Sequence, residues 1–212
     1  MKIAFITSLF GEKIPQPSQF KRAEGHDYFL FGDKEQKDFN TSWEVHNISS
    51  NPIISNLNCN IRRSRYAKFM GWELLSSMDL HYDFIFYCDV HYSPNPDTDW
   101  CGVCKKILSR DFAFLQDVHD NNKVRQLGII EECKGILFHG RDTEANMEKT
   151  INFFKQNYPS VNLSASQYFQ NTMFGYSPNS KAVKSLTSEF WKLYTTANIT
   201  YRDQPIWNLL LL

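Results

Sequence analysis

The chain has 212 residues, and its 23 Lys and Arg residues balance 23 Asp and Glu residues, so the formal net charge is zero. This length suits one ordinary domain, 1–212, with a genuine hydrophobic core. A balanced charge gives no long-range attraction to nucleic acid or to an anionic membrane. No stretch approaches the ~20 apolar residues that span a bilayer. We therefore expect neither a nucleic-acid partner nor a membrane span.

The cysteines and the carboxyl end suggest where the chain works and how it continues. Its five cysteines are an odd number at irregular spacing, which argues for a reducing compartment, and we expect a cytoplasmic protein. The apolar run 205–212 resembles the start of an amphipathic helix without a capping Gly. Either the chain is the amino-terminal part of a longer protein with further domains after it, or this run is a last helix docked into the core.

Strand-like and helix-like patterns alternate along the chain. Apolar runs predict strands at 2–9, 27–31, 43–48, 82–88, 112–115 and 168–176. Helical spacing of apolar residues predicts helices at 61–75, 104–108, 144–158 and 181–194. The polar segment 121–142 has room for a helix followed by an active-site loop. This alternation predicts an α/β fold with a largely parallel central sheet, helices on both faces, and ligands beyond the carboxyl ends of the strands.

One strand ends in a chemically distinctive triplet, Asp89-Val90-His91. Because side chains alternate along an extended chain, Asp89 and His91 would point to one side and Val90 to the core. A carboxylate oxygen beside an imidazole nitrogen suits manganese or a similar divalent ion. On spacing alone, an Asp that follows a strand is more often a turn or helix cap.

The predicted helix 61–75 begins with arginines. Arg62, Arg63 and Arg65 lie in its early turns, where positive charge opposes the helix macrodipole unless an anion lies nearby. They are therefore candidate phosphate ligands. An ordinary solvated helix face explains them equally well.

A rival motif is Cys101-Gly102-Val103-Cys104, which resembles a thioredoxin active site. A dithiol at a helix amino terminus would have a first thiol of lowered pKa and could exchange disulfides. The thioredoxin resemblance also calls for a cis-proline downstream, and the chain has no proline between Pro96 and Pro159. A dithiol oxidoreductase remains the alternative function; zinc binding would need a second Cys or His pair of matching spacing.

Three motifs in order resemble those of GT-A type glycosyltransferases. Asp89-Val90-His91 resembles their Asp-x-Asp metal motif, with His in place of the second acid. Residues 168–178 resemble the Tyr-Phe-Asn strand of retaining, glycogenin-like transferases, and 201–208 resemble their Asp-Gln segment. The Arg-Asp-Gln variant at 202–204 is also similar to a plant and bacterial group of hexosyltransferases. As a whole, the chain resembles the amino-terminal glycosyltransferase domains of chlorella-virus proteins that glycosylate the capsid.

The resemblance implies a three-layer α/β/α fold with a mostly parallel, mixed central sheet. It implies that a hexose or deoxyhexose, above all glucose or rhamnose, passes from a UDP-sugar to a glycan hydroxyl, with retention and on a capsid glycoprotein. It also implies Mn²⁺ or Mg²⁺ held by Asp89 and His91.

The residues at the ends of the first strands would bind the nucleotide. In this reading Thr7 and Ser8 meet the uridine, although a simple strand-end turn explains them as well. Asp33 accepts hydrogen bonds from uracil or ribose. Arg63 and Arg65 reach the diphosphate, for which a guanidinium is a bidentate, always charged partner.

The later motifs would surround the reacting sugar. Asp203 is the candidate carboxylate nearest that sugar, with a helix N-cap as its alternative role. Gln204 and Asn171 would contact the donor hydroxyls or the reactive face. His139 and Asp142 are secondary candidates for contacts with the acceptor.

Overall fold

The computed structural model describes residues 1–12, 16–17, 19–109, 114–118, 128–164 and 169–212. The chain divides into two compact units. The first unit comprises Met1–Leu115 and Thr172–Thr187, and the second comprises Gln116–Asn171 and Ser188–Leu212. No helix of the described residues is both long enough and apolar enough to cross a membrane.

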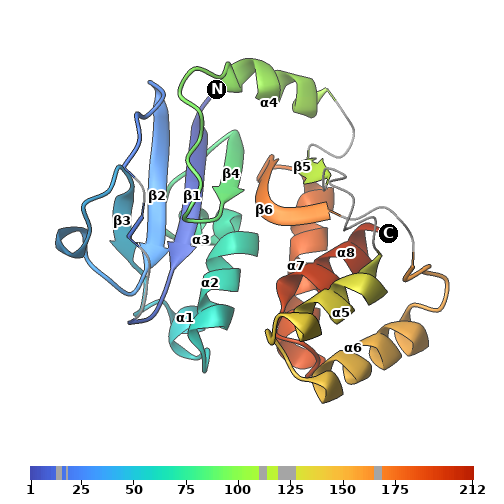
Figure 1. The fold of residues 1–212 in the computed structure, drawn as a ribbon. Helices are drawn as coiled ribbons and strands as arrows, with labels where there is room; N and C mark the ends of the chain where they lie inside the picture. Colours follow the sequence, from blue (N-terminus) through green and yellow to red (C-terminus); the bar gives the residue numbers. More distant parts are fainter. Residues whose placement is uncertain (13–15, 18, 110–113, 119–127, 165–168) are drawn as a thin grey trace. The chain divides into compact units, whose positions relative to one another are not determined.

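Strands and helices alternate from β3 onwards, whereas β1 and β2 follow each other with no helix between them in the described residues (Figure 1). The strands are β1 (Ile3–Leu9), β2 (His26–Gly32), β3 (Glu44–Asn47), β4 (Phe84–Cys88), β5 (Phe114–Val118) and β6 (Phe169–Tyr176). The helices are the 3₁₀ helix η1 (Gln36–Asp38), α1 (Pro52–Ser55), α2 (Asn60–Phe69), α3 (Gly71–Ser77), α4 (Trp100–Leu108), α5 (Ile129–Phe138), α6 (Glu144–Asn157), α7 (Lys181–Thr196) and α8 (Asp203–Leu211).

The strands form one six-stranded sheet in the order β3-β2-β1-β4-β6-β5. The strands β1 to β4 pair in parallel, and β6 is antiparallel to β4. The predicted α/β class with a mostly parallel, mixed sheet is therefore confirmed.

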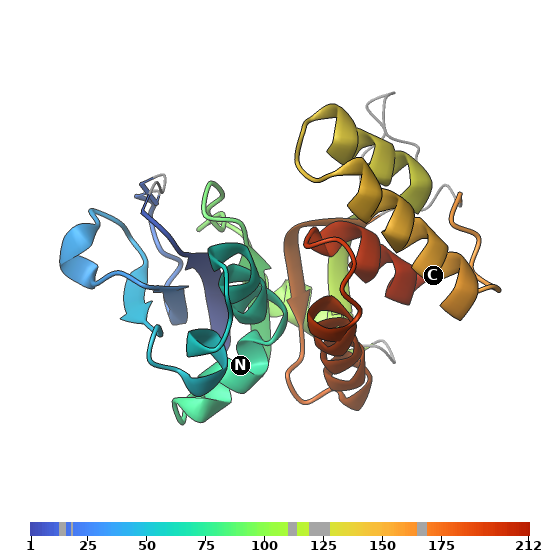
Figure 2. The ribbon, with the colours of Figure 1, turned by 90° about the horizontal axis from the view of Figure 1, so that it is seen from below.

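In the first unit, the alternation of side chains along β1 fills two layers. Phe5 belongs to a core cluster with Trp100 and Cys104 of α4. Ile6 faces the other way, towards α3, where a Cβ on Gly71 would lie 2.3 Å from Ile6 Cδ1. The parallel strands thus lie between α4 on one face and α2 and α3 on the other (Figures 1 and 2).

The single helix predicted over 61–75 is two helices. It breaks at Met70, whose φ of −106° and ψ of 23° are not helical. Gly71 follows and leaves space for β1, where a larger side chain would collide with Ile6. Apolar spacing predicted which residues face the core, but the break follows from close approach to a strand, which spacing does not encode. Helix α4 also begins earlier than predicted, because the Asp99 side chain caps it by accepting from the Gly102 N–H at 2.9 Å.

In the second unit, α5 packs against both α6 and α8 (Figure 2). Helix α8 buries Ile206, Trp207 and Leu209. Most of the apolar run 205–212 therefore belongs to α8 and packs into the second unit. Parts of three predictions lie outside the described residues: 112–113 of one strand, Tyr168 of another, and 121–127 of the polar segment.

Candidate functional site

Polar residues gather at the carboxyl ends of the parallel strands of the first unit. Ser8 lies near the end of β1, Asp33 directly follows β2, and Asp89 directly follows β4. Because these strands are parallel neighbours, their carboxyl ends share one edge of the sheet. We call this edge the strand-end rim and define it by Thr7, Ser8, Asp33 and Asp89. The sequence predicted strand ends at Ser8, Asp33 and Asp89, in agreement with the structure, whereas Thr7 lies two residues before the end of β1 and is fully buried.

Asp89 is held by two partners at the strand-end rim. Its Oδ1 accepts a hydrogen bond from the Tyr87 hydroxyl at 2.9 Å and lies 3.5 Å from Lys68 Nζ. The Lys68 side chain is 3% exposed, whereas the Asp89 side chain is 40% exposed. A buried ammonium on α2 therefore pairs with a carboxylate that solvent still reaches.

Sequence reasoning missed both partners of Asp89. Tyr87 precedes Asp89 by two positions on the strand, a spacing at which the two side chains can meet. Lys68 lies one helical turn after Ser64 and Arg65, which places it on the same side of α2. Both patterns are visible in the sequence, but neither distinguishes these residues from ordinary core and surface positions.

The Tyr87 hydroxyl connects several rim residues. Burial is the largest cause that raises the Tyr87 pKa well above its usual value, and Asp89 raises it further. The charge of Arg65 and a hydrogen bond with Ser8 lower the Tyr87 pKa, so both residues lie near this hydroxyl. The phenol therefore stays protonated and donates to Asp89. Ser8 also reaches α2, since its Oγ lies 2.8 Å from Ser64 Oγ.

Thr7 and Asp33 present buried oxygens without partners. Asp33 Oδ2 accepts from the Gly11 N–H at 3.1 Å, which ties the turn after β2 to the loop after β1. Asp33 Oδ1 and Thr7 Oγ1 are buried and have no hydrogen-bond partner among the described residues. An unsatisfied buried polar atom costs about 1–3 kcal/mol. Solvent reaches neither atom, so a ligand could contact them only after neighbouring side chains move.

Thr7 and Ser8 do not act as a pair. Consecutive residues of a strand point to opposite faces of the sheet, and Ser8 turns to α2. Thr7 is fully buried. Thr7 and Ser8 therefore cannot both contact a ligand that lies on one face of the sheet.

Arg63 is held at the start of α2. Its Nε donates to the Leu57 carbonyl at 3.2 Å, and its Nη1 lies 3.4 Å from Asn60 Oδ1. These contacts use part of its donor set and fix the loop before α2. Arg65, rather than Arg63, is the arginine near the Tyr87 hydroxyl.

The metal motif has a different backbone from the expected one. Strand β4 ends at Cys88, and the Tyr92 N–H donates to the Asp89 carbonyl at 2.9 Å, which closes a turn. The alternation argument therefore does not apply to His91, which is exposed, although Val90 is buried as predicted.

The donor set at this turn restricts how a metal could bind. No group of three or more His, Cys, Asp or Glu side chains suited to a metal occurs in the described part of the chain. Asp89 and His91 offer an oxygen and a nitrogen, and the Asp89 carboxylate is partly exposed. Mg²⁺ is commonly held by one or two carboxylates together with substrate phosphates and water. The residues fit a divalent ion that binds jointly with a diphosphate, not an ion held by protein alone.

In the second unit, Asn171 and Asp203 form a buried pair. Asn171 Nδ2 donates to Asp203 Oδ2 at 3.2 Å, and the two residues are 3% and 4% exposed. Asp203 is the first residue of α8, and the cap position belongs to Arg202. The carboxylate is therefore not the N-cap, although the helix macrodipole still favours negative charge there.

Asn208 fixes the start of β6 on α8. Its Oδ1 accepts from the Phe169 N–H at 2.7 Å, and its Nδ2 donates to the Phe169 carbonyl at 3.0 Å. Gln204 Nε2 adds a longer contact, 3.4 Å, to the same carbonyl. Asn208 thus positions Asn171, two residues further along β6, relative to Asp203. In the sequence this role is visible only as a polar residue within an apolar helix.

The two secondary candidates differ. Asp142 accepts hydrogen bonds from the Thr143 N–H, Asn146 Nδ2 and Thr200 Oγ1, the last at 2.6 Å. This carboxylate fixes a loop, and its hydrogen-bonding capacity is largely used. His139 is exposed at the end of α5.

The dithiol motif lies at the start of α4, and both of its thiols are free. Cys104 is fully buried in the core cluster, and this burial raises its thiol pKa to about 12. Such a thiol stays protonated at neutral pH, as in an ordinary core cysteine.

Of the protein-family models and curated proteins compared with the chain, none matches it. Among solved structures, the apo crystal structure of mouse xyloside xylosyltransferase 1 matches with a TM-score of 0.53 and 9% sequence identity, over 99% of this chain and 81% of that chain. This likeness shows the fold: the chain shares the α/β architecture of that structure, in agreement with the GT-A type fold expected from its motifs.

Proposed function

We propose that the chain is a glycosyltransferase that moves a sugar from a UDP-sugar to a glycan hydroxyl. One observation carries the proposal: in a transferase fold, Ser8, Arg65 and Asp89 converge around the Tyr87 hydroxyl at the strand-end rim. In α/β sheets, ligands bind beyond the carboxyl ends of the strands. A convergent polar cluster at that place is the feature expected of a donor site.

The nucleoside would lie against the ends of β1 and β2. Asp33, which is partly exposed as a residue, would accept from uracil or ribose, and Thr7 would lie buried beneath the nucleoside. Arg65 would bind the diphosphate, with Arg63 and Ser8 beside it. The guanidinium keeps its charge at any physiological pH.

A divalent ion would bind at Asp89 and His91 together with the diphosphate, and we propose Mn²⁺ or Mg²⁺. When bound, such an ion stabilises the charge that develops on the leaving diphosphate. The chain's own contribution is orientation: the Tyr87 hydroxyl and the Lys68 ammonium fix one carboxylate oxygen of Asp89.

The Asn171–Asp203 pair and Gln204 would contact the transferred sugar, with Asp203 as the nearest carboxylate. This assignment rests on the sequence motifs, and the hydrogen bond between Asn171 and Asp203 supports a preformed arrangement. Transfer of glucose or rhamnose with retention, to a capsid glycoprotein, rests on the sequence resemblance alone. Retention does not require Asp203 to be a nucleophile, because the leaving phosphate can accept the proton of the acceptor.

Calorimetry with UDP, with and without Mn²⁺, tests the proposal. We expect UDP to bind in the presence of Mn²⁺ and Arg65→Ala to weaken binding about tenfold or more, because a hydrogen bond to a charged group is worth about 1.5–3 kcal/mol. Arg22→Ala, at an exposed arginine that is not among the candidate phosphate ligands, is the matched control and should bind normally. A panel of UDP-sugars then identifies the donor by the sugar that is hydrolysed or transferred.

The outcomes separate the candidate functions. No binding of UDP under either condition, or an equal loss in both arginine variants, contradicts the proposal. If the chain is a dithiol oxidoreductase instead, neither the wild type nor any variant should bind UDP. Cys101→Ser should then abolish the redox activity.

A further inference from the structure

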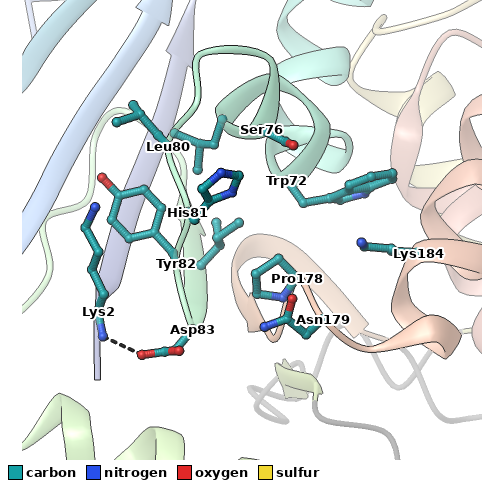
Figure 3. Close-up of a pocket in the computed structure, with 12 residues that line it drawn as sticks. Lys2, Trp72, Ser76, Leu80, His81, Tyr82, Asp83, Pro178, Asn179 and Lys184 are labelled. Atoms are coloured by element: carbon teal, nitrogen blue, oxygen red, sulfur yellow. Dashed lines mark hydrogen bonds between the residues drawn. The ribbon is translucent and has the colours of Figure 1, made fainter.

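A pocket lies in the first unit at the other end of the strands from the strand-end rim. Its volume is about 330 Å³. Lys2 and Asp83, which precede β1 and β4, belong to its lining, so it opens at the amino-terminal ends of these strands. Figure 3 shows six of the lining side chains: Trp72, His81, Tyr82, Asp83, Asn179 and Lys184.

Two aromatic rings of the lining are fixed in place. The Trp72 indole N–H donates to Thr187 Oγ1 at 3.1 Å, and the Tyr82 hydroxyl donates to Asp27 Oδ2 at 2.8 Å. Lys184 Nζ lies 5.0 Å from the Trp72 ring centroid. The pocket therefore has a rigid aromatic wall whose rings lose little conformational freedom when a ligand packs against them.

Besides the Lys2 ammonium, which lies 4.5 Å from the Tyr82 ring centroid, three polar groups of the lining are available to a ligand. Asp83 Oδ2 accepts from the Lys2 backbone N–H at 2.7 Å, which holds the carboxylate in position. The second Asp83 oxygen, the Asn179 side-chain amide and the Lys184 ammonium make no hydrogen bond to another described residue. The pocket thus offers an acceptor, a mixed donor and acceptor, and a donor.

This combination selects a class of ligand. An anion would suit Lys184 but would be repelled by Asp83, and a cation would meet the reverse conflict. Hydroxyl groups donate to the carboxylate and accept from the ammonium, so they satisfy both. A sugar ring joins such hydroxyls to an apolar face that can pack on an aromatic ring, and the partly exposed Trp72 offers such a ring.

We propose that this pocket binds one sugar residue of the acceptor glycan, away from the site of transfer. That this glycan is the acceptor rests on the proposed glycosyltransferase function, whereas the binding of a sugar rests on the pocket itself. The site anchors the glycan and takes no part in bond making, so its contribution is to affinity for long acceptors.

Nuclear magnetic resonance on the whole chain tests the inference. The probes are the methyl glycosides of glucose, galactose, xylose and rhamnose, added separately, and the reporter is the indole N–H signal of Trp72, assigned with Trp72→Phe. We expect at least one glycoside to shift this signal saturably. Asp83→Asn should weaken that binding about tenfold, the loss expected when a hydrogen bond to a charged group is replaced by a neutral one.

Asp97→Asn is the matched control, because Asp97 is exposed and does not belong to the lining. If no glycoside moves the Trp72 signal, or if both Asp variants bind equally, the inference is overturned. A parallel titration with UDP and Mn²⁺ separates this failure from that of the proposed function: UDP should shift signals of the strand-end rim and leave Trp72 unchanged. UDP binding without glycoside binding overturns only the second site, whereas glycoside binding without UDP binding supports a sugar site and refutes the transferase.

Discussion

The pairing of Lys68 with Asp89 predicts an asymmetric response to substitution. Two unit charges 3.5 Å apart attract by about 5 kcal/mol at an effective dielectric constant of about 20. Water screens part of this, because the Asp89 side chain is 40% exposed. A net loss of about 2 kcal/mol is therefore expected when Asp89→Asn removes the carboxylate from an ammonium that is only 3% exposed.

The reverse substitution should be milder. Lys68→Met keeps the length of the apolar stem and removes the buried charge, while Asp89 keeps solvent and the Tyr87 hydroxyl as partners. We expect a change within about 1 kcal/mol. The double variant Lys68→Met/Asp89→Asn should then be more stable than Asp89→Asn alone, since the buried ammonium that needed the carboxylate is gone.

Urea unfolding of the four proteins in the cycle measures these free energies, with Asp79→Asn at a fully exposed carboxylate as a control that should stay within about 0.5 kcal/mol of the wild type. The predicted asymmetry is wrong if Asp89→Asn is no more destabilising than Lys68→Met, or if the double variant is less stable than Asp89→Asn. The cycle also matters for function. A loss of UDP binding in Asp89→Asn indicates a ligand role only if the stable double variant loses it too.

Three further substitutions and conditions test the packing. Asn208→Ala removes three hydrogen bonds from a fully buried residue and should cost about 3 kcal/mol in urea unfolding, whereas Asn157→Ala, at an exposed site with one bond, should cost less than about 1 kcal/mol. Gly71→Ala would place a Cβ 2.3 Å from a core methyl and should lower the thermal midpoint; Gly135→Ala, with open space around it in α5, should gain up to about 1 kcal/mol. Burial raises the Tyr87 pKa in the folded chain above its value in the unfolded chain. The contribution of Tyr87 to the free energy of unfolding is therefore complete below about pH 10 and falls above that by about 1.4 kcal/mol per pH unit. Unfolding curves between about pH 8 and 11 check this sign, and Tyr87→Phe should make the decline less steep.

The sequence alone determined the order of the elements and the position of the strand-end rim. Long apolar runs that end in Ser8, Asp33 and Asp89 specify buried strands with polar carboxyl ends, and an alternating order of strands and helices specifies parallel pairing. These signals are local, because hydrophobic periodicity depends on neighbours along the chain. For the same reason the sequence located the candidate arginines on α2 but not their separate environments.

Only the tertiary structure decided which side chains meet. Lys68 and Asp89 are 21 positions apart, and Trp72 and Thr187 are 115 apart, so no local pattern predicts either contact. The helix break beside Gly71 likewise depends on how closely a helix approaches a strand. Hydrophobic periodicity predicts which residues are buried. It does not predict which residues they contact, because the contacts depend on how the whole chain packs in three dimensions.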